Sequence, residues 1–196
     1  MYEKLKKDST WTIIERSAFE IDQIKKEFLS YDEEWFLDTS RQERTYSHTN
    51  TQCYSILEWS YTWEPSQKPE SIKKYSLKTS EAQAQLDKIC KDLEDFYSGK
   101  VMRLEFIKLL PYRNINKHVD GGSSLGYARR CHIPIITNEK VLFNVKDNSM
   151  NMKEGICYEI NNVLLHSVEN PTSLDRVHLI IDILPDSMLQ YNKTGE

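Results

Sequence analysis

The segment NINKHVDGGSSLGYARRCHIPI, residues 114–135, contains the pattern that most constrains the fold and chemistry of this 196-residue chain. His118 and Asp120 stand two residues apart in it, directly before two glycines. Side chains at positions i and i+2 of a strand point to the same face, so a strand that continues through both residues would direct them into one cavity. The same residues also fit a polar strand end that leads into a glycine turn. The surrounding sequence decides between these interpretations.

Short apolar runs separated by turn residues lie on both sides of this segment, from residue 100 onward. Close spacing of such runs is typical of an antiparallel sandwich or barrel. The runs are VMRLEFIKLLPY (101–112), YARRCHIPIIT (127–137), KVLFNV (140–145), GICYEI (155–160), NVLLHSV (162–168) and RVHLIIDIL (176–184).

Helical patterns are found in the N-terminal part of the chain. Residues 17–30 have apolar side chains at three-to-four spacing, and Ser17 with Glu20 predicts a capping box. Residues 79–97 predict a second amphipathic helix that ends at Gly99. Its apolar stripe comprises Ala82, Leu86, Ile89, Leu93 and Phe96. The Thr-, Tyr- and Trp-rich residues 45–63 predict a strand.

These patterns together predict a fold of the α+β class. We expect a double-stranded β-helix core (jelly-roll or cupin-like) with N-terminal helices packed on it. The length favours a single domain over residues 1–196, with a helix-containing part at 1–99 and a β-core at 100–185.

The composition narrows the class of partner. Lys and Arg number 26 against 30 Asp and Glu, and the net charge of -4 indicates neither a nucleic-acid nor a membrane partner. The four cysteines form no CxxC motif, which favours free thiols in a reducing compartment over two disulfides in a secreted protein. There is no signal-peptide pattern and no window of about 18 apolar residues. We therefore expect a cytoplasmic protein of undetermined oligomeric state.

Four of the five histidines lie in the β-rich half, and one of them completes a metal site. His166 follows the His118–Asp120 pair by 46 residues and is the natural third ligand. Two histidines and one carboxylate on one side of a metal form the facial triad of non-haem Fe(II) oxygenases, which leaves positions open for a co-substrate and dioxygen.

Two arginines strengthen this interpretation. Arg176 opens the apolar strand RVHLIIDIL, and a buried guanidinium there requires an anionic partner because an unpaired buried charge is costly. Arg130 and His132 show the same i, i+2 relation on another strand. A dicarboxylate ligand would satisfy this set of cations.

Three runs of the sequence resemble a known protein family. The runs EEWFLDTSRQERTYSHTNTQCYSI (33–56), RCHIPIITNEKVLFNV (130–145) and MKEGICYEINNVLLHSVENPTSLDRVHLIIDIL (152–184) are similar to the aspartyl/asparaginyl β-hydroxylase family of Fe(II)/2-oxoglutarate-dependent dioxygenases. The resemblance covers most of residues 30–184. It implies an enzyme that hydroxylates a C–H bond with release of succinate and CO2, using Fe(II), 2-oxoglutarate and O2.

The resemblance also implies roles for individual residues. His118, Asp120 and His166 resemble the iron ligands. Asp120 supplies the carboxylate that the animal enzyme of the family lacks, as in the bacterial-type members. Arg176 resembles the residue that pairs with the distal carboxylate of 2-oxoglutarate, and the cofactor-binding set implied for that co-substrate is Arg176, Arg130 and His132.

Other positions are less constrained. Ile107 stands near the place where a family member has a 2-oxoglutarate-contacting serine, which is a departure from the pattern. His178, His48 and Arg41 are candidates for a supporting or substrate-binding role. Cys131 lies between Arg130 and His132 and is expected to face the opposite way, into packing.

The expected substrate is a small molecule, a free amino acid such as proline, aspartate, asparagine or arginine, since the chain shows no tandem-repeat extension and no membrane anchor. The close alternative is hydroxylation of an Asp, Asn or other residue in a protein or peptide. A non-catalytic cupin-like metal- or ligand-binding protein is the third reading, and an open iron face beside Arg176 argues against it.

Overall fold

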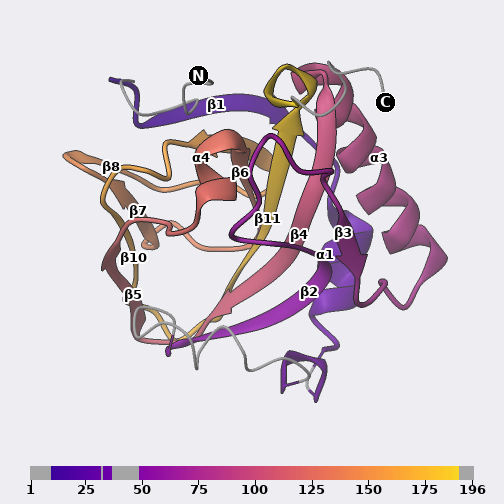
Figure 1. Cartoon of the computed structure of the whole chain (residues 1–196). Helices are drawn as coiled ribbons and strands as arrows, with labels where there is room; N and C mark the ends of the chain where they lie inside the picture. The colour runs from indigo at the N-terminus through magenta and orange to yellow at the C-terminus, as the bar shows by residue number, and fades with distance from the viewer. Residues whose placement is uncertain (1–9, 32, 37–48, 190–196) are drawn as a thin grey trace.

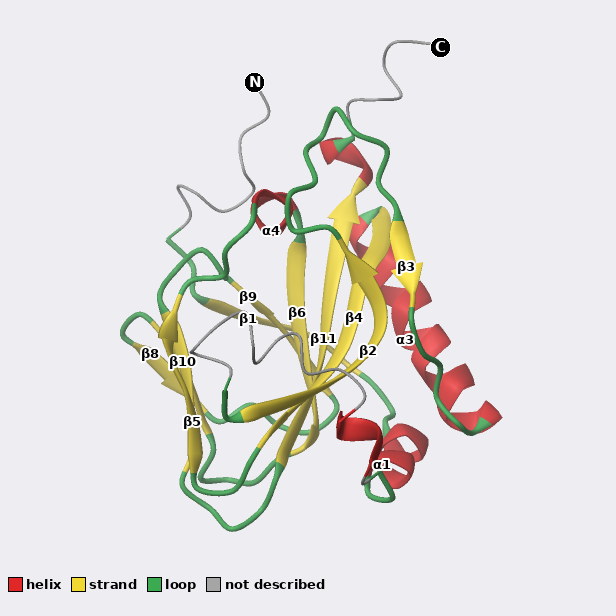
Figure 2. Cartoon of the chain, turned by 60° about the horizontal axis from the view of Figure 1, so that its bottom comes forward, coloured by secondary structure: helices red, strands yellow, loops and turns green. Residues whose placement is uncertain are grey.

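Two facing antiparallel sheets form a β-sandwich in the computed structural model, which describes residues 10–31, 33–36 and 49–189 (Figures 1 and 2). The seven-stranded sheet has the order β1-β9-β6-β11-β4-β2-β3, and the four-stranded sheet has the order β5-β10-β7-β8. The larger sheet comprises β1 (Ile13–Ala18), β2 (Thr51–Trp59), β3 (Ser71–Lys73), β4 (Gly99–Leu109), β6 (Arg129–Ile136), β9 (Ile156–Ile160) and β11 (Arg176–Pro185). The smaller sheet comprises β5 (Arg113–His118), β7 (Leu142–Val145), β8 (Asn148–Met150) and β10 (His166–Asn170).

Two helices cover the outer face of the larger sheet (Figure 2). Among the described residues, the helical segments are α1 (Asp22–Phe28), η1 (Glu33–Phe36), α3 (Ser80–Tyr97), α4 (Ser123–Tyr127) and η3 (Asp186–Met188). Apolar residues of α1 and α3 pack against β4, β6 and β11 in one core, whose members include Ile24, Leu86, Phe106, Ile133 and Ile181. Within the described residues, no helix is both long and apolar enough to span a membrane.

Strand β11 lies in the middle of the larger sheet and is buried along its whole length. Its residues alternate between two environments. Val177, Leu179, Ile181 and Ile183 belong to the core shared with the helices. The residues between them, which include Arg176, His178 and Asp182, therefore face the smaller sheet. Successive side chains of β11 point to opposite faces of the sheet, and both faces are covered. The charged side chains of β11 are therefore buried, although they do not belong to the apolar core beneath the helices.

The six apolar runs predicted from the sequence all contain strands, namely β4, β6, β7, β9, β10 and β11. The strand predicted at residues 45–63 corresponds to β2, although residues 45–48 lie outside the described residues. Three strands from the part before residue 100 extend the same sheet that the later strands form. The helix-containing N-terminal part thus also contributes two edges of the larger sheet.

The predicted helix at residues 17–30 is wrong in its first turn. Ser17 lies in β1, which pairs with β9, and the helix begins only at Asp22. Its N-cap residue, Ile21, makes no side-chain capping bond, so the expected Ser17–Glu20 capping box is absent. Pairing with β9 outweighed the helical periodicity, because backbone hydrogen bonds to an existing sheet edge stabilise the extended conformation.

The second predicted helix is confirmed as α3, with two differences at its C-terminal end. Phe96 is 56% exposed rather than part of the apolar stripe. Ser98, not Gly99, adopts the left-handed conformation that ends the helix, with φ of 46°. Gly99 instead opens β4, where an added Cβ would meet the Leu184 carbonyl oxygen at 2.4 Å. A close approach of β4 to the end of β11 therefore requires this glycine.

Glu27 joins the two helices through a buried carboxylate. It is 5% exposed and accepts hydrogen bonds from the Tyr31 hydroxyl, the Lys78 and Thr79 backbone N–H groups and the Thr79 hydroxyl. Thr79 is the N-cap residue of α3. Burial alone would raise the pKa of Glu27, but these four donors lower it below its ordinary value.

We expect Glu27→Gln to lower the free energy of unfolding by about 1–3 kcal/mol, because an amide NH2 would replace one acceptor and leave buried donors unsatisfied. The melting temperature measured by circular dichroism should fall by roughly 2–4 °C for each kcal/mol. Exposed Glu20→Gln is the matched control and should leave it unchanged.

The same carboxylate predicts a pH dependence of stability. Because the folded pKa of Glu27 is below its unfolded value of about 4.3, its contribution is present above that value and is lost as the pH falls through the folded pKa. The stability difference between wild type and Glu27→Gln should therefore shrink below about pH 4. A difference that is constant from neutral pH to pH 3 would contradict this assignment.

Candidate metal centre and active site

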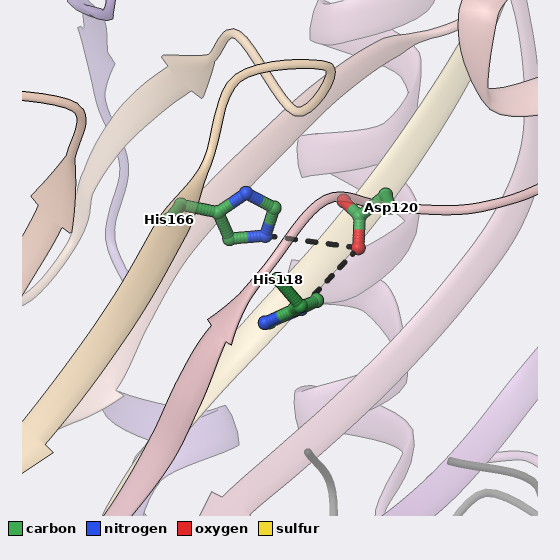
Figure 3. A group of neighbouring side chains, drawn as sticks. All are labelled: His118, Asp120 and His166. Carbon is green, nitrogen blue, oxygen red and sulfur yellow. Dashed lines mark ion pairs between the residues drawn. The ribbon is translucent and has the colours of Figure 1, made fainter. Parts of the chain in front are cut away.

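His118, Asp120 and His166 meet between the two sheets (Figure 3). His118 ends β5, His166 opens β10, and the two residues are direct cross-strand partners. One ligand atom from each of the three residues lies within 4.8 Å of the others. The Asp120 Oδ1 atom is 3.6 Å from His118 Nε2 and 3.7 Å from His166 Nε2. Three potential ligands thus converge on one point.

The expectation that one strand carries both His118 and Asp120 is wrong. Strand β5 ends at His118, and Asp120 lies in the turn that follows. The Asp120 backbone N–H donates to the Asn162 carbonyl at 3.1 Å, which returns the chain towards the site. Asp120 therefore reaches the two histidines from a turn held by a neighbouring segment, not from the pleat of a strand.

Backbone carbonyls determine which nitrogen of each histidine is available. His118 Nδ1 lies 2.7 Å from the Asn116 carbonyl oxygen, and His166 Nδ1 lies 2.9 Å from that of Leu164. A carbonyl only accepts a hydrogen bond, so each Nδ1 carries the proton and donates. Each Nε2 then presents its lone pair towards Asp120. This is the tautomer and orientation of a metal-ligating imidazole.

The Asp120 carboxylate is ionised, and its two oxygens face different partners. Its Oδ1 faces the histidines, and its Oδ2 accepts a hydrogen bond from Arg130 Nη1 at 2.7 Å. Burial alone would raise the pKa of Asp120, but the Arg130 charge holds it well below its ordinary value. Two neutral imidazoles and one carboxylate are the ligand set that suits Fe(II) with open positions, so these residues fit the metal.

A mostly apolar cavity adjoins this centre. Its walls are Ile107, Ile115, Phe143, Val168 and Ile180, together with the three potential ligands and three further polar residues, Arg130, His132 and Arg176. An apolar cavity with a few convergent polar groups is typical of a small-molecule site. Ile107, the departure from the family pattern, lines this cavity.

Arg176 brings an uncompensated positive charge to the cavity. Its residue exposure is 1%, and no acidic side chain among the described residues pairs with it. Its Nη2 contacts His178 Nδ1 at 2.6 Å, and its Nε has no partner in the part of the chain that the structure describes. Burial lowers the pKa of Arg176 below its ordinary value. A buried guanidinium in this state favours an anionic ligand strongly.

His132 and His178 lie beside Arg176. Both are buried, and burial together with the Arg176 charge lowers the pKa of each well below its ordinary value, so both are neutral. His178 Nδ1 faces the Arg176 N–H and so accepts from it, which places the proton of His178 on Nε2. Neither ring nitrogen of His132 finds a hydrogen-bond partner within the described residues. His132 can therefore receive a polar ligand in the cavity.

Arg130 lines the same cavity, but its guanidinium is already engaged. Besides Asp120 it donates to both carboxylate oxygens of Asp182, each at 2.7 Å. Asp182 and its second partner, Arg103, had no role in the sequence-based prediction. The signal that could have indicated them is the presence of charged residues inside two largely apolar runs, Arg103 in VMRLEFI and Asp182 in HLIIDIL.

The remaining predicted residues divide into two groups. Cys131 faces the helix-side core, as predicted from its place between Arg130 and His132. His48 and Arg41 lie outside the described residues, so their predicted roles stay predictions.

Comparisons with known proteins agree with this geometry. The family model described as aspartyl/asparaginyl beta-hydroxylase matches residues 18–185. A comparison with curated proteins returns no match.

Three solved structures share the fold at low identity. An oxidoreductase of the 2OG-Fe(II) oxygenase family from Burkholderia pseudomallei is 10% identical, with 88% of this chain and 84% of that chain covered and a TM-score of 0.56. A Pseudomonas putida prolyl-4-hydroxylase is 9% identical over 90% and 94% of the two chains, with a TM-score of 0.52. The viral collagen prolyl hydroxylase of Paramecium Bursaria Chlorella virus-1, in its 2OG complex, is 9% identical over 89% and 96%, with a TM-score of 0.51.

The family match covers most of the chain and includes every residue of the candidate centre. It confirms the resemblance found in the sequence. The chain belongs to the aspartyl/asparaginyl β-hydroxylase family and is an oxygenase that uses Fe(II), 2-oxoglutarate and O2.

Proposed function

We propose that His118, Asp120 and His166 hold Fe(II), and that Arg176 binds the distal carboxylate of 2-oxoglutarate in the adjoining cavity. The orientation of both histidine Nε2 atoms towards one Asp120 oxygen supports the first assignment. His132, with two unpartnered nitrogens in the same cavity, is the further candidate for holding the co-substrate.

The observation that carries this proposal is the unpaired charge of Arg176. A buried cation costs several kcal/mol unless an anion compensates it, and a protein that retains such a cation beside a metal site gains affinity for an anionic ligand. A ligand that combines a metal-chelating end with a distant carboxylate matches both parts of the cavity. 2-Oxoglutarate is such a dicarboxylate.

When bound, Fe(II) and 2-oxoglutarate would supply the oxidising chemistry: 2-oxoglutarate and O2 would be converted to succinate and CO2, with one oxygen atom of O2 entering succinate and the other a substrate C–H bond. The protein's residues orient and enclose these groups. The Asn116 and Leu164 carbonyls keep the two histidines in the ligating tautomer. The apolar side chains of the cavity limit the access of water, which strengthens the pairing of a carboxylate with Arg176.

The proposed substrate is a free amino acid, such as proline, aspartate, asparagine or arginine, which is hydroxylated on a carbon atom. The description of the family, aspartyl/asparaginyl beta-hydroxylase, supports an amino-acid carbon as the site of reaction. The second candidate is an Asp, Asn or other residue within a protein or peptide, and the names of the two prolyl hydroxylase structures, one of them a collagen prolyl hydroxylase, agree with this second class. We further propose that the whole chain is one dioxygenase domain built on a double-stranded β-helix.

The test is succinate release from 2-oxoglutarate by the Fe(II)-loaded protein, screened against the free amino acids. We expect one amino acid to stimulate succinate release and to gain the mass of one oxygen atom. If no amino acid is hydroxylated but a protein from a cell extract gains oxygen, the second substrate class replaces the first. His166→Ala is the negative control for both.

A separate measurement distinguishes an oxygenase from a non-catalytic metal-binding protein. Under anaerobic conditions, addition of Fe(II) and 2-oxoglutarate should give a visible charge-transfer band that neither component gives alone. Protein that gives no such band and does not bind 2-oxoglutarate would contradict the assignment of Arg176 and the metal ligands.

A further inference from the structure

Four buried charged side chains form a continuous row that begins at the metal centre. Asp182 on β11 is the direct cross-strand partner of Arg130 on β6 and of Arg103 on β4. Arg103 Nη1 donates to Asp182 at 2.8 Å, and Arg130 donates to Asp182 through Nε and Nη2 at 2.7 Å each. Arg130 Nη1 also donates to Asp120 Oδ2 at 2.7 Å, which connects the row to the metal centre. The side chains of all four are at most 8% exposed.

The guanidinium groups of this row are fully compensated. Arg103 also lies 3.9 Å from the buried Glu105 carboxylate, so three carboxylates face two guanidinium groups. Arg130 therefore has no unmet need for a further anion, whereas Arg176 has one. Burial alone would lower the pKa of Arg130, but Asp120 and Asp182 raise it well above its ordinary value. The positive charge that a co-substrate carboxylate encounters is therefore that of Arg176.

The geometry of Arg130 also restricts the orientation of Asp120. A guanidinium is planar and presents its N–H groups at fixed angles. Asp182 occupies the Nε–Nη2 edge of Arg130 in a bidentate pair, which leaves Nη1 directed at Asp120 Oδ2. With Oδ2 held in this way, Oδ1 is the oxygen that faces the two histidine Nε2 atoms.

We propose that Arg130 and Asp182 are positioning residues for the metal: Asp182 orients Arg130, and Arg130 holds Asp120 so that a single carboxylate oxygen is presented to the ion. This inference rests on the proposed function of Asp120 as a metal ligand. It assigns Arg130 to the metal ligand rather than to the co-substrate, and it gives a role to Asp182, a residue without one so far.

The far end of the row supports the turn that carries Asp120. Arg103 Nη2 donates to the Trp59 carbonyl at 2.6 Å, and its guanidinium carbon lies 3.9 Å from the centre of the Tyr61 ring. The Tyr61 carbonyl accepts the Ser124 N–H at 3.3 Å. At Gly122, where φ is +103°, an added Cβ would lie 2.7 Å from the same carbonyl oxygen. The segment just after Asp120 is thus packed on a loop that Arg103 holds.

The experiment compares Arg130→Lys with Arg176→Met in the metal-free full chain, titrated with Co(II) as the probe. Lysine keeps the positive charge but cannot bridge two carboxylates with a planar fork. We expect Arg130→Lys to weaken Co(II) binding roughly 10- to 100-fold, the range found for groups that orient metal ligands. We also expect it to change the visible Co(II) spectrum, because the carboxylate ligand loses its fixed orientation. Arg176→Met should change neither.

The second half of the experiment measures 2-oxoglutarate binding at saturating Co(II). Arg176→Met should lose most of this affinity, and Arg130→Lys should lose much less. If Arg130→Lys leaves the Co(II) affinity and spectrum unchanged, the positioning role is overturned, and a loss of 2-oxoglutarate affinity in that variant would assign Arg130 to the co-substrate. A tighter Co(II) affinity would also overturn the proposal.

A variant that does not fold is identified by circular dichroism before titration. Asp182→Asn then replaces Arg130→Lys as the test, because it preserves the shape of the side chain while removing its charge, and it should also weaken Co(II) binding and alter the spectrum. Wild-type affinity in Asp182→Asn would overturn the proposal. Failure of the proposed function gives a different result, since the wild-type protein itself would then bind no Co(II) at this site.

Discussion

Replacing Asp120 with alanine is expected to abolish amino-acid-dependent succinate release and to weaken Fe(II) binding by at least about 100-fold. Removal of a group that only orients a metal ligand weakens metal binding by up to about 100-fold. Asp120 is itself a proposed ligand, so its removal should weaken binding at least as much. Asp120 also supplies the one carboxylate of the centre, so its loss removes the charge that offsets the metal. Fe(II) affinity should be measured anaerobically, by competition with a chelating dye.

Glu169→Gln is the matched control for this variant. Glu169 is an exposed carboxylate on β10, the strand that begins with His166. Its removal should change neither Fe(II) affinity nor succinate release. Retention of wild-type Fe(II) affinity by Asp120→Ala would show that the metal is held elsewhere in the chain.

Arg176→Met is expected to weaken 2-oxoglutarate binding by roughly 30- to 4,000-fold while it stabilises the protein that lacks the co-substrate. Loss of one partner of a buried charge pair costs about 2–5 kcal/mol of binding free energy, and each 1.4 kcal/mol corresponds to about a factor of 10. In the absence of the co-substrate, the variant no longer carries an unpaired buried charge. Its melting temperature should therefore rise.

These opposite changes distinguish a binding role from a structural one. If Arg176 only stabilised the fold, Arg176→Met would lower the melting temperature and would affect 2-oxoglutarate binding only through unfolding. Isothermal titration at saturating metal and a circular dichroism melt give the two quantities. Arg113→Gln, which removes an exposed arginine from β5, is the control and should leave both unchanged.

The residues of the centre were predictable because their chemistry is largely independent of the detailed fold. His118, Asp120 and His166 are ligand types in an order that suits a facial triad, and the structure brings them together. The strand geometry used in the prediction was wrong, since Asp120 lies beyond the end of β5. The three side chains nevertheless lie together, because the turn also returns Asp120 to the histidines through its backbone bond to Asn162.

The secondary structure was predictable where local and tertiary preferences coincide. The helix α3 combines a threonine N-cap with a regular apolar stripe, and both features are local. Residues 13–18 have no such local signal for a strand, and their conformation follows from pairing with β9, which lies more than 130 positions later. A pattern read along the chain does not report on the edge of a distant sheet.

The sequence by itself determined the kinds of groups available to this protein: two histidines and a carboxylate for the metal, and arginines on apolar strands for anions. Only the tertiary structure decided which of these arginines lacks an acidic partner among the described residues. Arg130 and Asp182 are 52 positions apart, and they neutralise each other because the register of β6 against β11 places them directly opposite. Arg176, on the same strand as Asp182, has no acidic neighbour among the described residues and keeps its charge for a ligand. Charge pairing in a buried sheet depends on strand register, which is set by the packing of the whole domain.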